Sequence, residues 1–230
     1  MLYRTALAAL TALAASATMA LAHGDVAPQA VDTTGLPVNG EEWLTENPYR
    51  AATAGEETWA LAVKIGGSGF NQNCARCHGL GAVSGGLAPD LRFLEAEEYR
   101  DEWFAERFRD GYTQNGTTKM PAFGELLGQD AAWAIRTYIE TRPDDDSMAE
   151  AAPALTVLRD QIHGYATDNA GADPDALIAQ LNEIAGTITT YSGAPVADSV
   201  AFQAAKLIDG TAEGYTKAAE VLTIGLSAAH

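Results

Sequence analysis

The stretch Cys74-Ala75-Arg76-Cys77-His78 contains both cysteines of this 230-residue chain, and the interpretation of the rest starts from it. Two thiols three positions apart, followed at once by a histidine, form the pattern to which haem c is attached. Each thiol bonds one vinyl group of the porphyrin, and the adjacent imidazole binds the iron. The pentapeptide therefore predicts one covalent haem c, held by Cys74 and Cys77, with His78 as the first axial ligand of the iron.

Other interpretations of the two cysteines have less support. A zinc ribbon needs a second pair of ligands, which the chain lacks. A thioredoxin-type redox pair belongs to a βαβ context that the sequence does not show. A structural disulfide across only two intervening residues would be unusual. Haem attachment explains the whole pentapeptide, including the histidine.

The sixth coordination position of the iron decides whether a haem protein exchanges electrons only or also binds small molecules. Beyond residue 22 the chain has two methionines, Met120 and Met148. Met148 follows three aspartates that indicate a solvated linker, whereas Met120 lies in an expected loop and precedes the stiffening Pro121. We expect Met120 to be the second axial ligand. The alternative is a methionine that only fills a gap in the core.

The remaining histidines are weaker candidates for metal binding. His163 lies on an expected helix beyond the linker and His230 ends the chain, so each reaches the haem only if the tail folds back. His23 would become the N-terminal residue after removal of a leader, and it could then chelate copper with its amine and ring. Such a copper site needs a further histidine.

Residues 1–22 have the features of a bacterial secretory signal peptide. They carry an early cation, a run of Ala and Leu over residues 6–15, and the small-x-small end Ala20-Leu21-Ala22. The run is too short for a membrane span, and no later stretch approaches about 20 consecutive apolar residues. We expect a secreted, soluble protein of the periplasm with no membrane span.

The charge of the chain is strongly negative and is concentrated toward the C-terminus. The formal net charge is −17, and residues 144–230 carry 13 acidic residues against three basic ones. This balance argues against nucleic acid or an anionic membrane surface as a partner. With only four lysines in the chain, a lysine ring around the haem edge is not available either.

The helical spacing of apolar residues, together with the positions of the helix-breaking Gly and Pro residues, predicts an all-α chain in four parts. These are the signal peptide at 1–22, an irregular arm at 23–54, a haem domain at 55–143 and an acidic, Ala-rich helical extension at 144–230. In the arm, Trp43 and Tyr49 are the expected anchors on the haem domain; a disordered leader is the alternative.

Within the haem domain, helices are expected over residues 56–73, 97–109 and 130–141, the last one capped by Asp130. The extension contains four amphipathic segments, which predict either a small antiparallel bundle or helices packed directly on the haem domain. It shows no ligand cluster, nucleophile arrangement or phosphate loop. A docking or dimerising module and a stabilising appendage both remain open as its function.

The stretch from residue 66 to residue 142 resembles the class I cytochromes c, which are small helical folds with one haem bound by a histidine and a methionine. It covers about a third of the chain. The resemblance implies that the carbonyl of Pro89 accepts the second ring N–H of His78 and so orients the imidazole. It also implies that the first and last helices of the domain cross at Gly66, Phe70 and Tyr138.

A narrower resemblance is to the periplasmic cytochromes that accept electrons from quinoprotein alcohol dehydrogenases. It is carried by residues 23–26, 47–50 and 70–80. These dehydrogenases contain pyrroloquinoline quinone (PQQ). This implies a quinoprotein alcohol dehydrogenase as electron donor and a terminal oxidase or another cytochrome as acceptor. It implies an electron carrier and not an enzyme. The alternatives are a haem sensor or enzyme with an open sixth position, and a cytochrome subunit tethered to its dehydrogenase.

Overall fold

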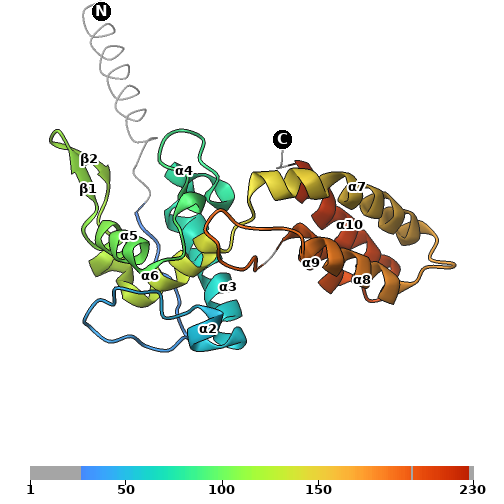
Figure 1. The fold of residues 1–230 in the computed structure, drawn as a ribbon, viewed down its shortest axis with the longest axis horizontal. Helices are drawn as coiled ribbons and strands as arrows, with labels where there is room; N and C mark the ends of the chain where they lie inside the picture. The colour runs from blue at the N-terminus through green and yellow to red at the C-terminus, as the bar shows by residue number, and fades with distance from the viewer. Residues whose placement is uncertain (1–26, 198, 228–230) are drawn as a thin grey trace, which may run out of the picture.

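The computed structural model describes residues 27–197 and 199–227. Within these ranges the regular secondary structure is helical apart from one hairpin, and the helices form two groups at opposite ends of the molecule (Figure 1). The predicted signal peptide, His23 and His230 lie outside the described residues. Among the residues described, no helix is both long enough and apolar enough to cross a membrane.

The first group of elements carries the predicted haem site. It contains α2 (Ala51–Ala54), α3 (Glu56–Asn73), α4 (Ala75–His78), the short 3-10 turns η2 (Leu80–Ala82) and η3 (Leu91–Phe93), α5 (Glu98–Asp110), the strands β1 (Tyr112–Gln114) and β2 (Thr117–Met120), and α6 (Gly124–Glu140). The all-α expectation is confirmed, and the order of elements in this group is the one that the resemblance to class I cytochromes c implies. Helix α3 has the bounds that the sequence predicts.

Helices α3 and α6 cross in close contact at Gly66. A β-carbon at this position would lie 1.9 Å from the carbonyl oxygen of Ala134, so only glycine lets the two backbones approach this closely. One turn later, the ring of the fully buried Phe70 packs on Tyr138 with 5.4 Å between the ring centroids. The predicted crossing of the first and last helices of the domain is confirmed.

The expectation that Asp130 caps the last helix of the domain is wrong. Helix α6 begins at Gly124, and its backbone is interrupted at Gly128, where φ is 74°. The Asp130 carboxylate instead accepts hydrogen bonds from the backbone N–H and the side-chain amide of Asn39, at 3.1 and 2.8 Å. A capping aspartate and one that anchors a distant loop look alike in the sequence, because each is an acceptor at the start of an apolar run.

Met120 lies at the end of a strand and not in the expected loop. Strands β1 and β2 form an antiparallel hairpin in which Tyr112 pairs with Met120. The two turn residues, Asn115 and Gly116, both have positive φ, as tight hairpin turns require. The Asn-Gly pair was the signal for this hairpin in an otherwise polar segment.

The N-terminal arm lies against the haem domain, as predicted. Tyr49 is fully buried, and its hydroxyl donates a hydrogen bond to the carbonyl oxygen of Pro37 at 2.7 Å. The Trp43 ring packs near Phe108, with 6.3 Å between centroids. Both anchors expected from the sequence therefore contact the body of the protein.

A buried cluster of charged residues joins the arm to α5 and α6. Asp101 is fully buried and forms ion pairs of 2.8 Å with both Arg50 and Arg136. Arg50 also pairs with the buried Glu140 at 2.8 Å. The carboxylate of Asp101 further accepts a hydrogen bond from the backbone N–H of Asn47. Two arginines facing two carboxylates balance the charge, which a buried cluster requires.

The C-terminal extension forms a four-helix group with its own core. The helices are α7 (Asp145–Thr167), α8 (Pro174–Ala185), α9 (Val200–Leu207) and α10 (Ala212–Ser227). Its buried side chains are mainly aliphatic and include Leu155, Leu158, Ile162, Leu177, Leu181, Ala204, Tyr215 and Leu222.

The interpretation of residues 144–148 as a solvated linker is wrong. Asp144 is buried and caps α7, because its carboxylate accepts a hydrogen bond of 2.7 Å from the backbone N–H of Ser147. Met148 is also buried, in the core of the extension. A run of three aspartates looks solvated in the sequence, but the first of them begins a helix and points inward.

We predict that Gly66→Ala lowers the free energy of unfolding by about 1–3 kcal/mol, because α3 and α6 must move apart to admit the methyl group. Gly164→Ala is the matched control: Gly164 lies within α7 with no atom within 4 Å of the added carbon. There, alanine should stabilise by about 0.5–1 kcal/mol. Urea unfolding followed by far-ultraviolet circular dichroism measures both; equal effects of the two substitutions would contradict the close crossing.

Asp144 gives the stability a dependence on pH. Burial disfavours its charge, but hydrogen bonds from the Thr189 hydroxyl and the Ser147 N–H outweigh this and lower the pKa of Asp144. A carboxylate whose pKa is lower in the folded state stabilises the fold at neutral pH, and this contribution is lost as pH falls through the folded-state pKa.

We therefore predict that Asp144→Ala lowers the free energy of unfolding by about 0.5–2 kcal/mol at pH 7. The difference from the unmodified protein should shrink as pH falls below about 4, because the carboxylate of the unfolded chain then binds a proton while the folded one, with its lowered pKa, stays charged. Asp146→Ala, which removes an exposed charge from the same turn, is the control. Urea unfolding at a series of pH values from about 3 to about 7, a range that includes the protonation of the unfolded carboxylate, measures the effect. A difference that does not change with pH would refute this assignment.

Candidate haem-binding site

The pentapeptide lies directly at the end of α3, so the α3–α6 crossing fixes its position. The backbone N–H of Cys74 donates to the carbonyl of Phe70 at 2.8 Å and closes α3. The next four residues form the single turn α4. Cys74 packs against the core of the haem domain, whereas Cys77 is exposed. Burial raises the pKa of the Cys74 thiol to about 12, so this thiol stays protonated at neutral pH.

The His78 ring is oriented by one backbone oxygen. Nδ1 of His78 lies 2.9 Å from the carbonyl oxygen of Pro89. A carbonyl oxygen can only accept, so Nδ1 carries the proton and donates. Nε2 is then left with its lone pair, which is the form of imidazole that binds a metal. This is the contact that the resemblance implies, and the ring is suited to hold iron.

The segment after His78 turns back sharply and leaves apolar side chains uncovered. Gly79 has a φ of 78°, and a β-carbon there would lie 1.8 Å from the carbonyl oxygen of Val83. Beyond this turn Leu80 and Leu87 are each 76% exposed. Both lie within nine residues of His78 in the sequence, on the segment that follows the pentapeptide. A flat apolar macrocycle attached at the neighbouring cysteines fits this surface.

Met120 and Cys74 pack against the same hydrophobic core, although 46 residues separate them in the sequence. The other predicted candidates lie elsewhere. Met148 belongs to the separate core of the extension, and His163 is exposed on α7. Among the described methionines and histidines, Met120 and His78 are the two that the fold assigns to the haem domain.

Sequence reasoning missed two residues that support the site. Asp90 follows Pro89 directly, and its carboxylate accepts hydrogen bonds from the backbone N–H and the guanidinium of Arg92. The guanidinium also pairs with Asp145 at 2.7 Å. The Asp-x-Arg spacing is a local signal for the first contact. No sequence signal links Arg92 to a residue more than 50 positions later.

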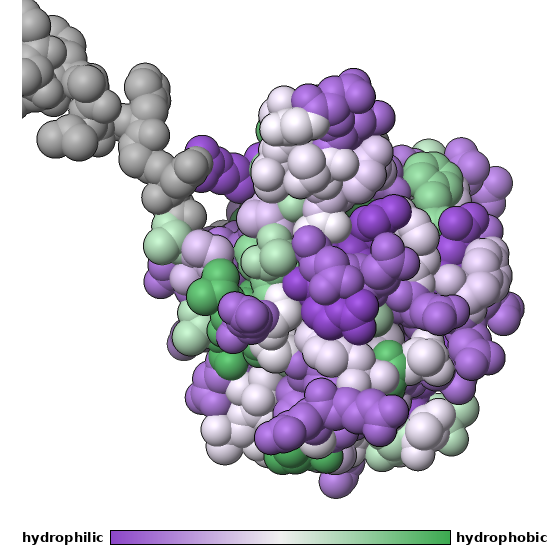
Figure 2. Space-filling model, turned by 90° about the vertical axis from the view of Figure 1, so that its left-hand side faces the viewer, coloured by the Kyte–Doolittle hydropathy of each residue, from purple (hydrophilic) through white to green (hydrophobic). Residues whose placement is uncertain are grey.

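The end of the molecule that carries the β1–β2 hairpin is mostly hydrophilic. Figure 2 shows this face with small, separate hydrophobic areas and no continuous apolar surface. Leu80 and Leu87, which follow the pentapeptide in the sequence, are exposed apolar side chains.

Comparisons with known proteins point to one family. Residues 61–139 match the family described as cytochrome c oxidase, cbb3-type, subunit III. The chain is 54% identical over 123 residues to cytochrome c550 of Pseudomonas aeruginosa, a match that covers 54% of this chain and 83% of that protein. It is 30% identical over 142 residues to the chloroplastic cytochrome c6 of Chlamydomonas reinhardtii, which covers 62% of this chain and 89% of that protein.

A further relative is a larger protein. The chain is 34% identical over 93 residues to quinohemoprotein alcohol dehydrogenase ADH IIB of Pseudomonas putida, covering 40% of this chain but only 13% of that enzyme. No solved structure gives a significant match. From its identity to cytochrome c550 over most of that protein's length, and from its class I architecture, this chain belongs to the cytochrome c family of electron carriers, which bind haem c covalently.

Proposed function

We propose that this cytochrome carries one haem c on Cys74 and Cys77, with His78 and Met120 as the axial ligands of its iron. The observation that carries the proposal is the 2.9 Å contact between Nδ1 of His78 and the Pro89 carbonyl, which leaves Nε2 free to bind a metal. When bound, the haem supplies an iron that gains and loses one electron. The protein fixes the imidazole, excludes water from one side and presents the other edge to a partner.

A methionine as second ligand favours electron transfer over the binding of gases or substrates. The neutral, soft sulfur of a thioether prefers ferrous iron and gives a higher reduction potential than a second imidazole. Met120 is partly buried against the core that also contacts Cys74. It is the last residue of β2, and its backbone is paired with Tyr112 of β1. A side chain held in this way is suited to close the sixth position, in contrast to the open site of a sensor or enzyme.

We further propose that the donor is a quinoprotein (PQQ) alcohol dehydrogenase and that the acceptor is a terminal oxidase or another cytochrome. The alignment with quinohemoprotein alcohol dehydrogenases supports the first, because in those proteins a segment like this one is part of the enzyme itself. The match to an oxidase subunit family supports the second. A periplasmic location, reached by removal of residues 1–22, fits such partners.

The two hydrophobic cores support the proposed division into a haem domain at 55–143 and a helical extension at 144–230. The cluster around α3, α5 and α6 and the cluster around α7 to α10 share no buried residue. The arm at 23–54 adds Tyr49 and Leu36 to the first cluster. We assign the binding of the haem to the first domain.

We predict that Met120→Ala opens the sixth position. The ferrous form of this variant should bind carbon monoxide within the mixing time, whereas the unmodified protein should bind it slowly or not at all, because the sulfur occupies the site. Met148→Ala is the matched control, since its sulfur lies in the core of the extension. Absorption spectroscopy with carbon monoxide is the measurement. A Met120→Ala variant that behaves like the unmodified protein would exclude Met120 as the ligand.

We predict that a quinoprotein alcohol dehydrogenase reduces the oxidised protein at a rate that rises with cytochrome concentration, as expected for a diffusing carrier. Leu80→Glu should slow this reaction roughly tenfold, because a charge must be desolvated in the contact. Val157→Glu, on the exposed surface of α7, is the control. Stopped-flow absorbance measures the rates. Equal rates for the two variants would exclude docking beside the haem, and a rate independent of concentration would indicate a tethered subunit.

A further inference from the structure

We propose that the C-terminal extension supports the haem: Asp145 of α7 acts through Arg92 and Asp90 to hold the Pro89 carbonyl against His78. This inference rests on the proposed ligation of iron by His78. It makes Asp145 a positioning residue, although it lies outside the part of the chain that resembles class I cytochromes c. It also assigns a role to the extension, for which the sequence offers only a docking module or a stabilising appendage.

The loop that carries Pro89 is held mainly through the next residue. The Asp90 carboxylate accepts hydrogen bonds from the backbone N–H of Ser84 at 3.3 Å and from that of Arg92 at 3.0 Å. The hydroxyl of Ser84 donates to the carbonyl of Ala88. These bonds tie both ends of the loop to one carboxylate. The position of the Pro89 carbonyl therefore depends on where Asp90 is held.

Arg92 connects this carboxylate to the extension. Its side chain is only 4% exposed, and it lies between Asp90 at 2.9 Å and Asp145 at 2.7 Å. A second hydrogen bond of 3.0 Å to Asp145 makes the latter contact bidentate, which fixes the plane of the guanidinium. Burial disfavours the charge of Arg92, but the two carboxylates outweigh this and raise its pKa, so it stays charged.

Tyr191, in the connection between α8 and α9, closes the other side of the same contact. Its ring lies 5.4 Å from the guanidinium carbon of Arg92 and stacks on Phe93 with 4.4 Å between centroids. Its hydroxyl accepts a hydrogen bond from the backbone N–H of Asp145. Residues from two parts of the extension thus enclose one arginine of the haem domain.

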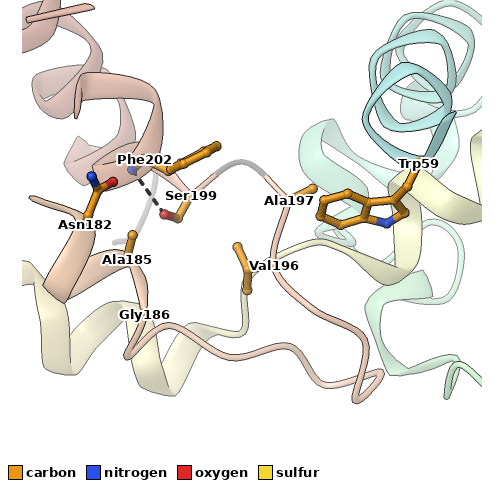
Figure 3. A pocket seen from close by; sticks show the side chains of 8 residues that line it. All are labelled: Trp59, Asn182, Ala185, Gly186, Val196, Ala197, Ser199 and Phe202. Carbon is orange, nitrogen blue, oxygen red and sulfur yellow. Dashed lines mark hydrogen bonds between the residues drawn. The ribbon is translucent and has the colours of Figure 1, made fainter. Parts of the chain in front are cut away.

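On another side, the junction of the two domains is hollow. A cavity of about 360 Å³ separates Trp59 of α3 from the α8 and α9 residues that face it, including Asn182 and Phe202 (Figure 3). At the edge of this cavity Ala197, from the segment before α9, packs against the core of the haem domain. The buried contact around Arg92 is where a movement of the extension would be transmitted to the Pro89 loop.

The strength of the hydrogen bond at Nδ1 sets the electron density that the imidazole gives to the iron. A stronger bond makes the ring a better donor, favours ferric iron and lowers the reduction potential. A looser Pro89 loop should therefore raise the potential and speed exchange of the Nδ1 proton with solvent. A purely stabilising appendage would change neither.

The test is Asp145→Ala in the full-length, haem-loaded protein. The side chain of Asp145 is 66% exposed, and in the variant the buried Arg92 keeps its ion pair with Asp90, so we expect the fold to be retained. Asp146→Ala is the matched control, because it removes the same charge one residue further along the same exposed turn. We expect the His78 Nδ1 proton, observed by paramagnetic NMR, to exchange on the order of fivefold faster in Asp145→Ala than in Asp146→Ala. The midpoint potential of Asp145→Ala should be the higher of the two.

Equal exchange rates and equal potentials in the two variants would overturn the positioning role of Asp145 and leave the ligation by His78 intact. Absence of paramagnetically shifted His78 protons from the unmodified protein would overturn the proposed ligation, and this inference with it. Faster exchange and a higher potential in Asp145→Ala alone would support the path through Arg92.

Discussion

The contact of α3 with α6 at Gly66 is the constraint on which the site depends. Because the backbone of Ala134 occupies the space of a side chain at this position, the two helices cross in one arrangement only. Helix α3 leads directly into Cys74. Helix α6 starts four residues after Met120, and the backbone N–H of Phe123 just before it donates a hydrogen bond to the carbonyl of Phe108. The crossing thus fixes the chain segments on which both proposed iron ligands lie.

Buried charges do much of the remaining assembly. Asp101 joins the N-terminal arm to the haem domain through Arg50 and Arg136, and Arg92 joins the extension to it through Asp145. Such pairs contribute little net stability compared with apolar packing, but leaving one partner alone is costly. They therefore favour one way of placing each added segment on the domain. The chain is strongly acidic, and a buried arginine neutralises the charge of a carboxylate that is buried beside it.

The sequence predicted much of the fold and of the site because those parts depend on local signals. The cysteine and histidine spacing, the glycine and aromatic on one face of α3, and the aliphatic periodicity of the extension are all local. What it missed depends on distant contacts. Asp130 binds Asn39 instead of capping a helix, Met148 lies in a core instead of a linker, and Arg92 reaches Asp145. In each case the local sequence indicates a capping or solvent-exposed residue, whereas the folded chain brings that residue into contact with a distant segment.

The central claim, that the pentapeptide holds a covalent haem, is tested most directly by mass spectrometry of the purified protein expressed with its maturation apparatus. Proteolysis should give a peptide containing Cys74 and Cys77 with the mass of one haem added through two thioether bonds. It should give no peptide in which those cysteines can be alkylated. A colourless protein with both thiols free, or a disulfide between them, would contradict the account.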